Sequence, residues 1–104
     1  MDYPWCISER EKYRESFFQL SKQWCQFQIE IGLYEAAADR IRYLLNKSIL
    51  DEEAHEMLLN IYFLQNDRVS FIKHYQKLSD LLRTELGLEP NESIRRLYEK
   101  VLKK

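Results

Sequence analysis

Apolar residues in the first third of the chain recur every three or four positions, which is the spacing of one face of an α-helix. This row consists of Tyr13, Phe17, Leu20, Trp24, Phe27 and Ile31. We expect the row to face the core of the protein. Ser8 and Glu11 have the spacing of a capping box, so we expect the helix to begin at Ser8. Gly32 can adopt a left-handed backbone conformation and is expected to end the helix.

Further segments with helical spacing follow, separated by residues that favour turns. The second helix runs from Tyr34 to the polar stretch 46–48. The third begins at the acidic residues 51–53, where the helix dipole favours negative charge. Asn66 and Asp67 tolerate turn conformations and can cap a helix, so we expect them to separate the third helix from the fourth. The residues expected to face inward are Tyr34, Ala37, Ala38, Ile41, Leu44, Leu45, Ala54, Leu58, Ile61, Tyr62, Phe71, Tyr75, Leu78, Leu82, Leu86, Ile94, Leu97, Tyr98 and Val101.

The composition favours a single all-α domain over residues 1–104. With only two glycines and two prolines, turns must be few and elements long, which favours helices over a β fold. The formal net charge of −1 provides no field that would attract nucleic acid or an acidic membrane. The chain has neither an apolar run long enough to span a membrane nor the features of a signal peptide. We therefore expect a cytoplasmic protein in which Cys6 and Cys25 are reduced thiols.

The two expected hairpin turns, at Gly32 and Asn66, are separated by 66 − 32 = 34 residues, the period of the tetratricopeptide repeat. Residues 32–37, GLYEAA, are similar to the usual turn of that repeat. The match to the tetratricopeptide consensus is degenerate, meaning that some consensus positions differ, because Leu59 and Phe71 occupy positions where the repeat has small residues. The sequence thus resembles a tetratricopeptide-like fold, with two antiparallel hairpins and a C-terminal capping helix in a right-handed α-solenoid. An unrelated bundle of four or five helices is the alternative.

The stretch ELGLEP, residues 85–90, combines half of the glycines and prolines of the chain. We expect Gly87 to end the fourth helix with a positive φ, and Leu88 to fold back as the hydrophobic contact of a Schellman-type cap. Pro90 prevents the helix from continuing, and Asn91 can cap a fifth helix. This segment would set the pose of the fifth helix, which covers the open end of the second hairpin.

Residues 51–102 resemble the bacterial transcriptional activator domain of the antibiotic regulatory proteins of streptomycetes and of related response regulators. The residues that carry the resemblance are Glu53, Ala54, His55, Leu58, Tyr62, Tyr75, Leu78, Leu82, Glu85, Leu86, Gly87 and Pro90. At the start of the chain, Trp5 followed by Glu9 and Arg10 is similar to the family's entry to its long first helix. Asn66 departs from the family's usual glycine, although asparagine can also adopt the left-handed conformation.

The sequence offers no pattern typical of a catalytic, metal or cofactor site, so we expect no enzyme activity and no cofactor. His55 and His74 lie on different helices and have no metal-ligand spacing, so we interpret His55 as a packing residue. The basic residues of the last helix are interpreted as a solvated helix C-terminus. The fourth helix lacks a basic recognition face, so we expect no direct DNA binding by this domain.

In a tetratricopeptide register, two sets of residues on the first and third helices face a common groove. They are Lys22, Gln26, Ile29 and Glu30, and Glu56, Asn60, Phe63 and Leu64. Ile29, Phe63 and Leu64 are large apolar side chains on this expected non-core face, which suggests a surface for a protein partner. Burial of Phe63 and Leu64 beneath the fifth helix is the alternative.

The family resemblance implies a regulatory and interaction module of a bacterial transcription factor. Such a module follows a winged-helix DNA-binding domain, sometimes with a receiver domain further upstream, so we expect this chain to be an excised fragment of a larger regulator. The resemblance implies contacts with a second copy, as in a homodimer, with neighbouring domains or with the transcription machinery. A free-standing peptide-binding adaptor and a small helical enzyme are the alternatives, although the enzyme would need a polar pocket that the sequence does not indicate.

Overall fold

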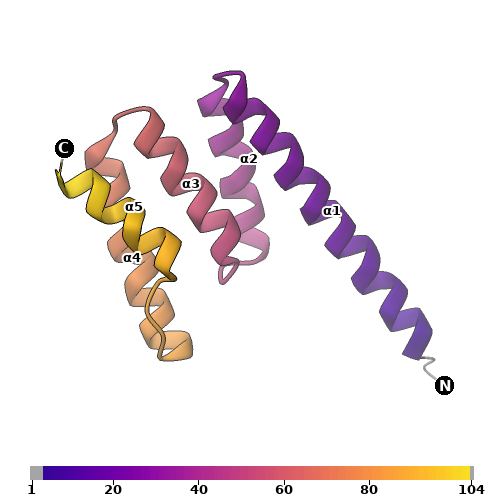
Figure 1. The fold of residues 1–104 in the computed structure, drawn as a ribbon. Helices are drawn as coiled ribbons and strands as arrows, with labels where there is room; N and C mark the ends of the chain where they lie inside the picture. Colours follow the sequence, from indigo (N-terminus) through magenta and orange to yellow (C-terminus); the bar gives the residue numbers. More distant parts are fainter. Residues whose placement is uncertain (1–3, 104) are drawn as a thin grey trace.

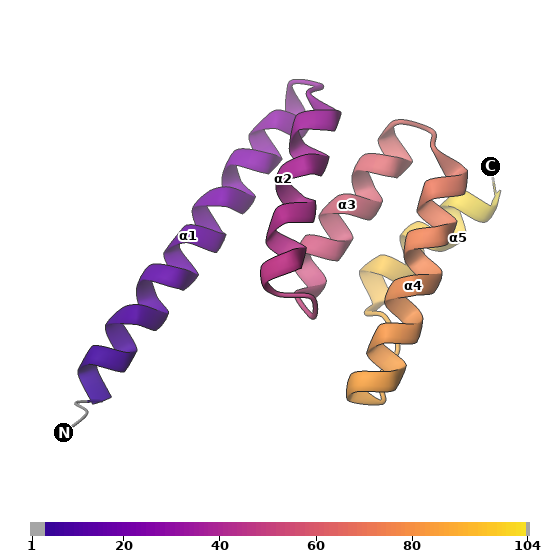
Figure 2. The ribbon, with the colours of Figure 1, turned by 180° about the vertical axis from the view of Figure 1, so that it is seen from behind.

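The computed structural model describes residues 4–103, with side chains from Glu15 onward, and this part of the chain forms five α-helices and no strand. The helices are α1 (Pro4–Glu30), α2 (Tyr34–Lys47), α3 (Glu52–Leu64), α4 (Arg68–Leu86) and α5 (Glu92–Lys103). Helices α1 and α2 form one antiparallel hairpin and α3 and α4 a second, while α5 packs against α3 and α4 (Figure 1, and from behind in Figure 2). The all-α, tetratricopeptide-like fold expected from the sequence is confirmed.

Helix α1 begins at Pro4, one turn before the predicted start at Ser8, so the prediction that Ser8 caps the helix is wrong. Proline suits the first turn of a helix, because its φ is already helical and an N–H there has no partner within the helix. Cys6, Ser8, Glu11 and Tyr13 have side chains outside the described residues. The N-terminal half of α1 extends well beyond the end of α2 (Figures 1 and 2).

Both hairpin turns have the same geometry. Gly32 has a φ of 85° and Asn66 a φ of 57°, so each holds the predicted left-handed conformation. In the first turn, Gly32 N–H donates to the Ile29 carbonyl and Leu33 N–H donates to the Gln28 carbonyl. These two bonds form a Schellman motif, and the same pair recurs around Asn66 at the end of α3.

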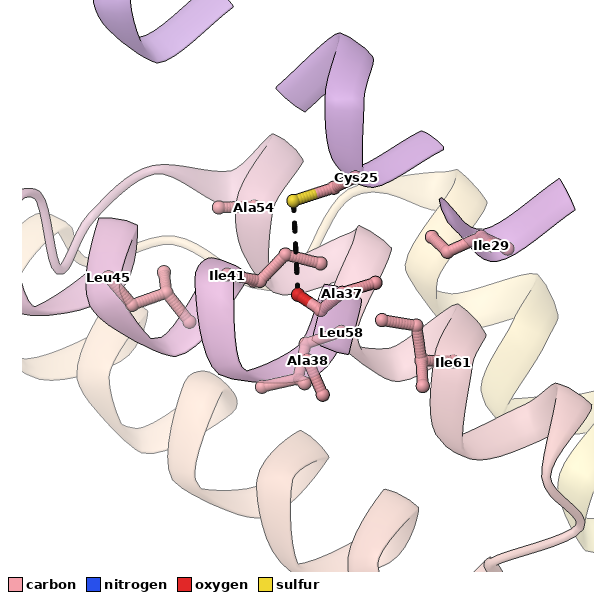
Figure 3. Packing of buried hydrophobic residues seen from close by; sticks show 9 residues of the cluster. All are labelled: Cys25, Ile29, Ala37, Ala38, Ile41, Leu45, Ala54, Leu58 and Ile61. Atoms are coloured by element: carbon pink, nitrogen blue, oxygen red, sulfur yellow. Dashed lines mark hydrogen bonds between the residues drawn. The ribbon is translucent and has the colours of Figure 1, made fainter. Parts of the chain in front are cut away.

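The side of α1 that packs against α2 is not the predicted apolar row. Among residues 15–30 of α1, the buried side chains are Ser21, Cys25, Gln28 and Ile29. Cys25 and Ile29 pack in one cluster with Ala37 and Ala38 of α2, whose small side chains let the two helices approach closely. The Cys25 thiol lies 3.8 Å from the Ala37 carbonyl and donates a hydrogen bond to it (Figure 3). This first core cluster comprises Cys25, Ile29, Ala37, Ala38, Ile41, Leu45, Ala54, Leu58 and Ile61.

The described part of the apolar row is exposed, so the prediction that it faces the core is wrong. Phe17, Leu20, Trp24, Phe27 and Ile31 are all between about half and two-thirds exposed, with Leu20 at 64% and Trp24 at 49%. The physical reason is the close packing against the alanines of α2, which leaves no room for aromatic rings between the helices. These five residues, named the apolar row from here on, lie on the side of α1 that the other helices do not cover.

A second core cluster holds α3, α4 and α5 together. It consists of Leu59, Phe71, Leu78, Leu82, Ile94 and Val101. Both large residues that depart from the repeat consensus, Leu59 and Phe71, are completely buried here. The rings of Tyr75 in α4 and Tyr98 in α5 stack beside the cluster with centroids 3.9 Å apart. The cluster thus contains most of the residues predicted to face inward from α4 and α5.

The segment between α4 and α5 follows the prediction in part. Gly87 has a φ of 64°, and its N–H donates to the Arg83 carbonyl, which is the simpler left-handed cap rather than a Schellman motif. The predicted inward packing of Leu86 and Leu88 is wrong, since both are about half exposed where the last turn of α4 projects past the core. Pro90 is buried instead.

Asn91 fixes the start of α5 as predicted. Its side-chain oxygen accepts from the Ile94 N–H at 3.0 Å, which is an N-cap. Its side-chain nitrogen donates to the Glu52 carboxylate at 3.1 Å, which connects α5 to the start of α3.

Candidate functional site

The structure brings three of the eight predicted groove residues to one cavity. Gln26 of α1 and Glu56 and Asn60 of α3 line a groove of about 340 Å³ whose remaining wall is α5. The complete lining of this groove, named the α1–α3–α5 groove, is Gln26, Glu56, Met57, Asn60, Ser93, Arg96, Leu97 and Lys100. The repeat register predicted a common face for these three residues, and they do line one groove, but the sequence did not indicate that α5 contributes half of the lining.

Ile29 is 5% exposed and belongs to the first core cluster, so its predicted place on a non-core face is wrong. It follows Cys25 by one helical turn and therefore shares the side of α1 that packs on the alanines of α2. Glu30 is exposed and does not line the groove. Leu64 is exposed at the end of α3, also outside the groove. Phe63 packs against the second core cluster and lines a smaller cavity with Val101 of α5, as the alternative of burial beneath α5 predicted.

Lys22 holds α1 to the start of α3. Its ammonium lies 2.8 Å from the Asp51 carboxylate and 3.2 Å from that of Glu53, and its side chain is largely buried. Burial lowers the pKa of Lys22, but the hydrogen bonds and charges of these two carboxylates outweigh it, so the pKa is raised overall. Asp51 also caps α3 by accepting from the Ala54 N–H. Lys22 is thus committed to an intramolecular contact.

The α1–α3–α5 groove carries charges of both signs. Burial, followed by the charges of Glu53 and Glu52, raises the pKa of Glu56. On the opposite wall, the Arg96 guanidinium lies 2.6 Å from the Glu92 carboxylate, and both side chains are exposed. Arg95 likewise lies 3.7 Å from Glu89. Part of the basic charge of α5 is therefore neutralised locally, which agrees with its interpretation as a solvated helix surface.

The apolar row is the largest set of exposed apolar side chains on one helix of the described chain. Its aromatic rings are clustered, since the Trp24 and Phe27 centroids lie 5.5 Å apart. Phe17 makes an edge-on contact with Phe18 at 5.8 Å. The row was visible in the sequence, but its periodicity did not reveal which side of α1 the neighbouring helices would cover.

A histidine pair that the sequence did not indicate joins α3 and α4. His55 Nε2 donates to the Ile49 carbonyl at 2.6 Å, which leaves Nδ1 as an acceptor for His74 Nε2–H at 2.9 Å. Burial lowers the pKa of His55. The pKa of His74 is lowered to about 4 by burial, and then by the charges of His55, Lys77 and Arg42. Only the packing of the two helices brings these residues together, because nothing in their separation along the chain is typical of a pair.

Residues 15–103 contain no group of three or more histidine, cysteine or acidic side chains that could hold a metal ion. None of the helices between residues 4 and 103 combines the length and the hydropathy that crossing a bilayer requires.

Comparison with known families gives a match that covers nearly the whole chain. The family model described as bacterial transcriptional activator domain matches residues 1–102, almost the whole chain. Comparisons with curated proteins and with solved structures give no match. The match agrees with the resemblance drawn from residues 51–102 and from Trp5, Glu9 and Arg10 near the start of the chain.

Proposed function

The chain belongs to the bacterial transcriptional activator domain family, and from this premise we propose that it is the self-associating interaction module of a cytoplasmic transcriptional regulator. The apolar row of α1 is the self-association surface, and the partner is a second copy of the same domain. DNA recognition lies in a separate winged-helix domain of the regulator. The observation that carries this proposal is the exposure of five large apolar side chains, four along α1 and Ile31 in the turn that follows it.

The size of the row supports a specific interface. An aromatic side chain presents about 150–250 Å², and three half-exposed rings with Leu20 and Ile31 leave roughly 500 Å² of apolar surface on one copy. Two copies in contact would bury roughly 1,000 Å² in total, which is the lower limit for a specific interface. Apolar patches of several hundred Å² usually mark interaction sites.

The spacing of the row supports a second copy as the occupant. Trp24 lies midway between Phe17 and Ile31. An antiparallel pair of α1 helices centred on Trp24 would place Phe17 opposite Ile31 of the second copy, and Leu20 opposite Phe27. The same row then supplies both sides of a twofold interface, as the commonest oligomers require.

Sedimentation equilibrium tests this proposal. We expect the chain to dimerise with a Kd of roughly 1–100 μM, because an interface near the lower size limit gives weak association. The double variant Leu20→Gln/Trp24→Gln should be monomeric with an unchanged helical circular dichroism signal. Val69→Gln on α4 is the matched control, because Val69 is 64% exposed, as Leu20 is. A chain that stays monomeric up to about 1 mM, or a double variant that still dimerises, would contradict the proposal.

A free-standing peptide-binding adaptor is the second candidate, and the α1–α3–α5 groove favours it. That groove combines the amides of Gln26 and Asn60 with apolar contact from Met57 and Leu97, a mixture that suits an extended peptide. The coding sequence upstream separates the two candidates. A winged-helix domain in the same reading frame supports the regulator, whereas a stop codon close by supports the adaptor.

A further inference from the structure

A cavity lies on the side of α3 opposite the α1–α3–α5 groove. Helices α2 and α4 both pack on α3, but no Cα atoms of α2 and α4 come within 8 Å of each other over their described lengths. Figure 2 shows the two helices on either side of α3. The space between them forms a cavity of about 480 Å³, larger than the α1–α3–α5 groove. This volume is within the range of small-molecule sites.

The floor of this cavity, named the histidine cavity, is apolar and its rim is basic. Leu45, Leu58 and Leu78 are buried residues that contribute to the floor. Arg42 from α2 and Lys77 from α4 contribute to the rim. No aspartate or glutamate among the described residues lines the cavity. An aliphatic chain fits such a floor, and a negatively charged head group fits such a rim.

The two cations differ in how far they are already engaged. The Arg42 guanidinium lies 3.1 Å from the Asp39 carboxylate and donates to the Tyr62 hydroxyl at 3.1 Å. Both Arg42 and Asp39 are well exposed, so this ion pair is weak and a ligand can compete for the guanidinium. Lys77 forms no ion pair with any carboxylate in residues 15–103. Its charge is therefore available.

The histidine pair adds a group that responds to an anion. His55 uses both ring nitrogens, one toward Ile49 and one toward His74, whereas His74 uses only Nε2 in a hydrogen bond to the described residues. The charged or titratable groups that face His74 are Arg42 from α2, His55 and Tyr62 from α3 and Lys77 from its own helix. Asp51 and Glu52 act on His55 from the start of α3. Burial, and then the nearby cations, hold the pKa of His74 low, and an anion in the cavity would offset the effect of the cations and favour protonation.

We propose that the histidine cavity binds a small aliphatic carboxylate. The carboxylate group of this ligand lies between Lys77 and Arg42, and its alkyl chain lies on the leucine floor. This inference does not depend on the proposed self-association, because α1 contributes no residue to the lining. The carboxylate is the recognised group and the apolar chain supplies the remaining affinity.

Isothermal titration of the whole chain with octanoate tests the proposal. Octan-1-ol has the same chain without the charge, and inorganic phosphate has the charge without the chain. We expect octanoate to bind about tenfold or more tightly than either, since a hydrogen bond to a charged group contributes more than 1 kcal/mol. If octan-1-ol bound as tightly as octanoate, the basic rim would have no role. If phosphate bound as tightly as octanoate, the apolar floor would have no role. Either result, or no binding of octanoate, would overturn the proposal.

Variants with matched controls locate the site. Lys77→Gln should weaken octanoate binding about tenfold, whereas Lys73→Gln, one turn earlier on α4 and also exposed, should have no effect. In the parent chain at neutral pH, where octanoate is an anion, its addition should shift the NMR signals of the His74 ring, which lines the cavity. Equal effects of the two lysine variants, or unshifted His74 signals, would show that octanoate binds elsewhere and would contradict the proposed site.

Discussion

Gly32 and Asn66 occupy equivalent places in the two hairpins, each with a left-handed backbone and the same two hydrogen bonds that reach back to the preceding helix. The repeat is therefore conserved in backbone geometry although the side chains differ between its two copies. Asparagine can replace glycine at this place because its short polar side chain tolerates the left-handed region. The two turns set the antiparallel pairing from which the groove and the histidine cavity follow.

Replacement of Gly87 by alanine should destabilise the protein by about 1 kcal/mol. A Cβ at this position would meet no atom within 4 Å, so the cost comes from the positive φ alone. Ile94→Ala should cost more, roughly 2–5 kcal/mol, because Ile94 is fully buried in the second core cluster. The two changes should be non-additive in denaturant unfolding, since both act on the docking of α5. Additive effects would mean that Gly87 does not control the pose of α5.

Replacement of Gln28 by methionine should stabilise the protein by about 1 kcal/mol. The Gln28 side-chain oxygen is buried and accepts no hydrogen bond from the described residues. Methionine has a similar length and removes this unsatisfied acceptor. The control is Gln23→Met on the exposed side of α1, which should change the free energy of unfolding by less than about 0.5 kcal/mol. A lower denaturant midpoint for Gln28→Met would contradict this expectation.

The protein should lose stability as the pH falls from about 6.5 to about 4. The pKa of His74 is lowered to about 4 in the folded state, so the unfolded chain binds a proton more readily between these values. The contribution of His74 to the free energy of unfolding is fully present above pH 6.5. It is lost as the pH falls below that value, by on the order of 2 kcal/mol after allowance for the partial exposure of His74. His74→Gln should show a shallower dependence of unfolding free energy on pH in this window and the same dependence above pH 7. An unchanged slope would mean that His74 is not held neutral.

The sequence predicted local features well because they depend on single residues. Gly32, Asn66 and Gly87 mark left-handed positions, and Asn91 marks a cap, since few other residue types suit those backbone conformations. The buried face of α1 was not predictable from periodicity alone. The row has the spacing of a core face, but the small alanines of α2 pack against an adjoining face of α1, which contains Cys25 and Ile29.

The candidate site was predicted only in part for the same reason. Gln26, Glu56 and Asn60 were placed on a common face by repeat register, whereas Ile29 was assigned to that face although it packs in the core. The pairing of His55 with His74 depends on how α3 and α4 align, which no spacing rule describes. Features that depend on the relative position of two helices could thus not be predicted from the sequence.

Association of two copies through the apolar row is tested most directly by isotope-filtered NMR. A mixture of ¹³C-labelled and unlabelled protein gives nuclear Overhauser contacts only across an interface between copies. We expect contacts that connect the Trp24 rings of the two copies and that connect Phe17 to Ile31 of the second copy. Intermolecular contacts confined to the α1–α3–α5 groove, or none in concentrated protein, would contradict it.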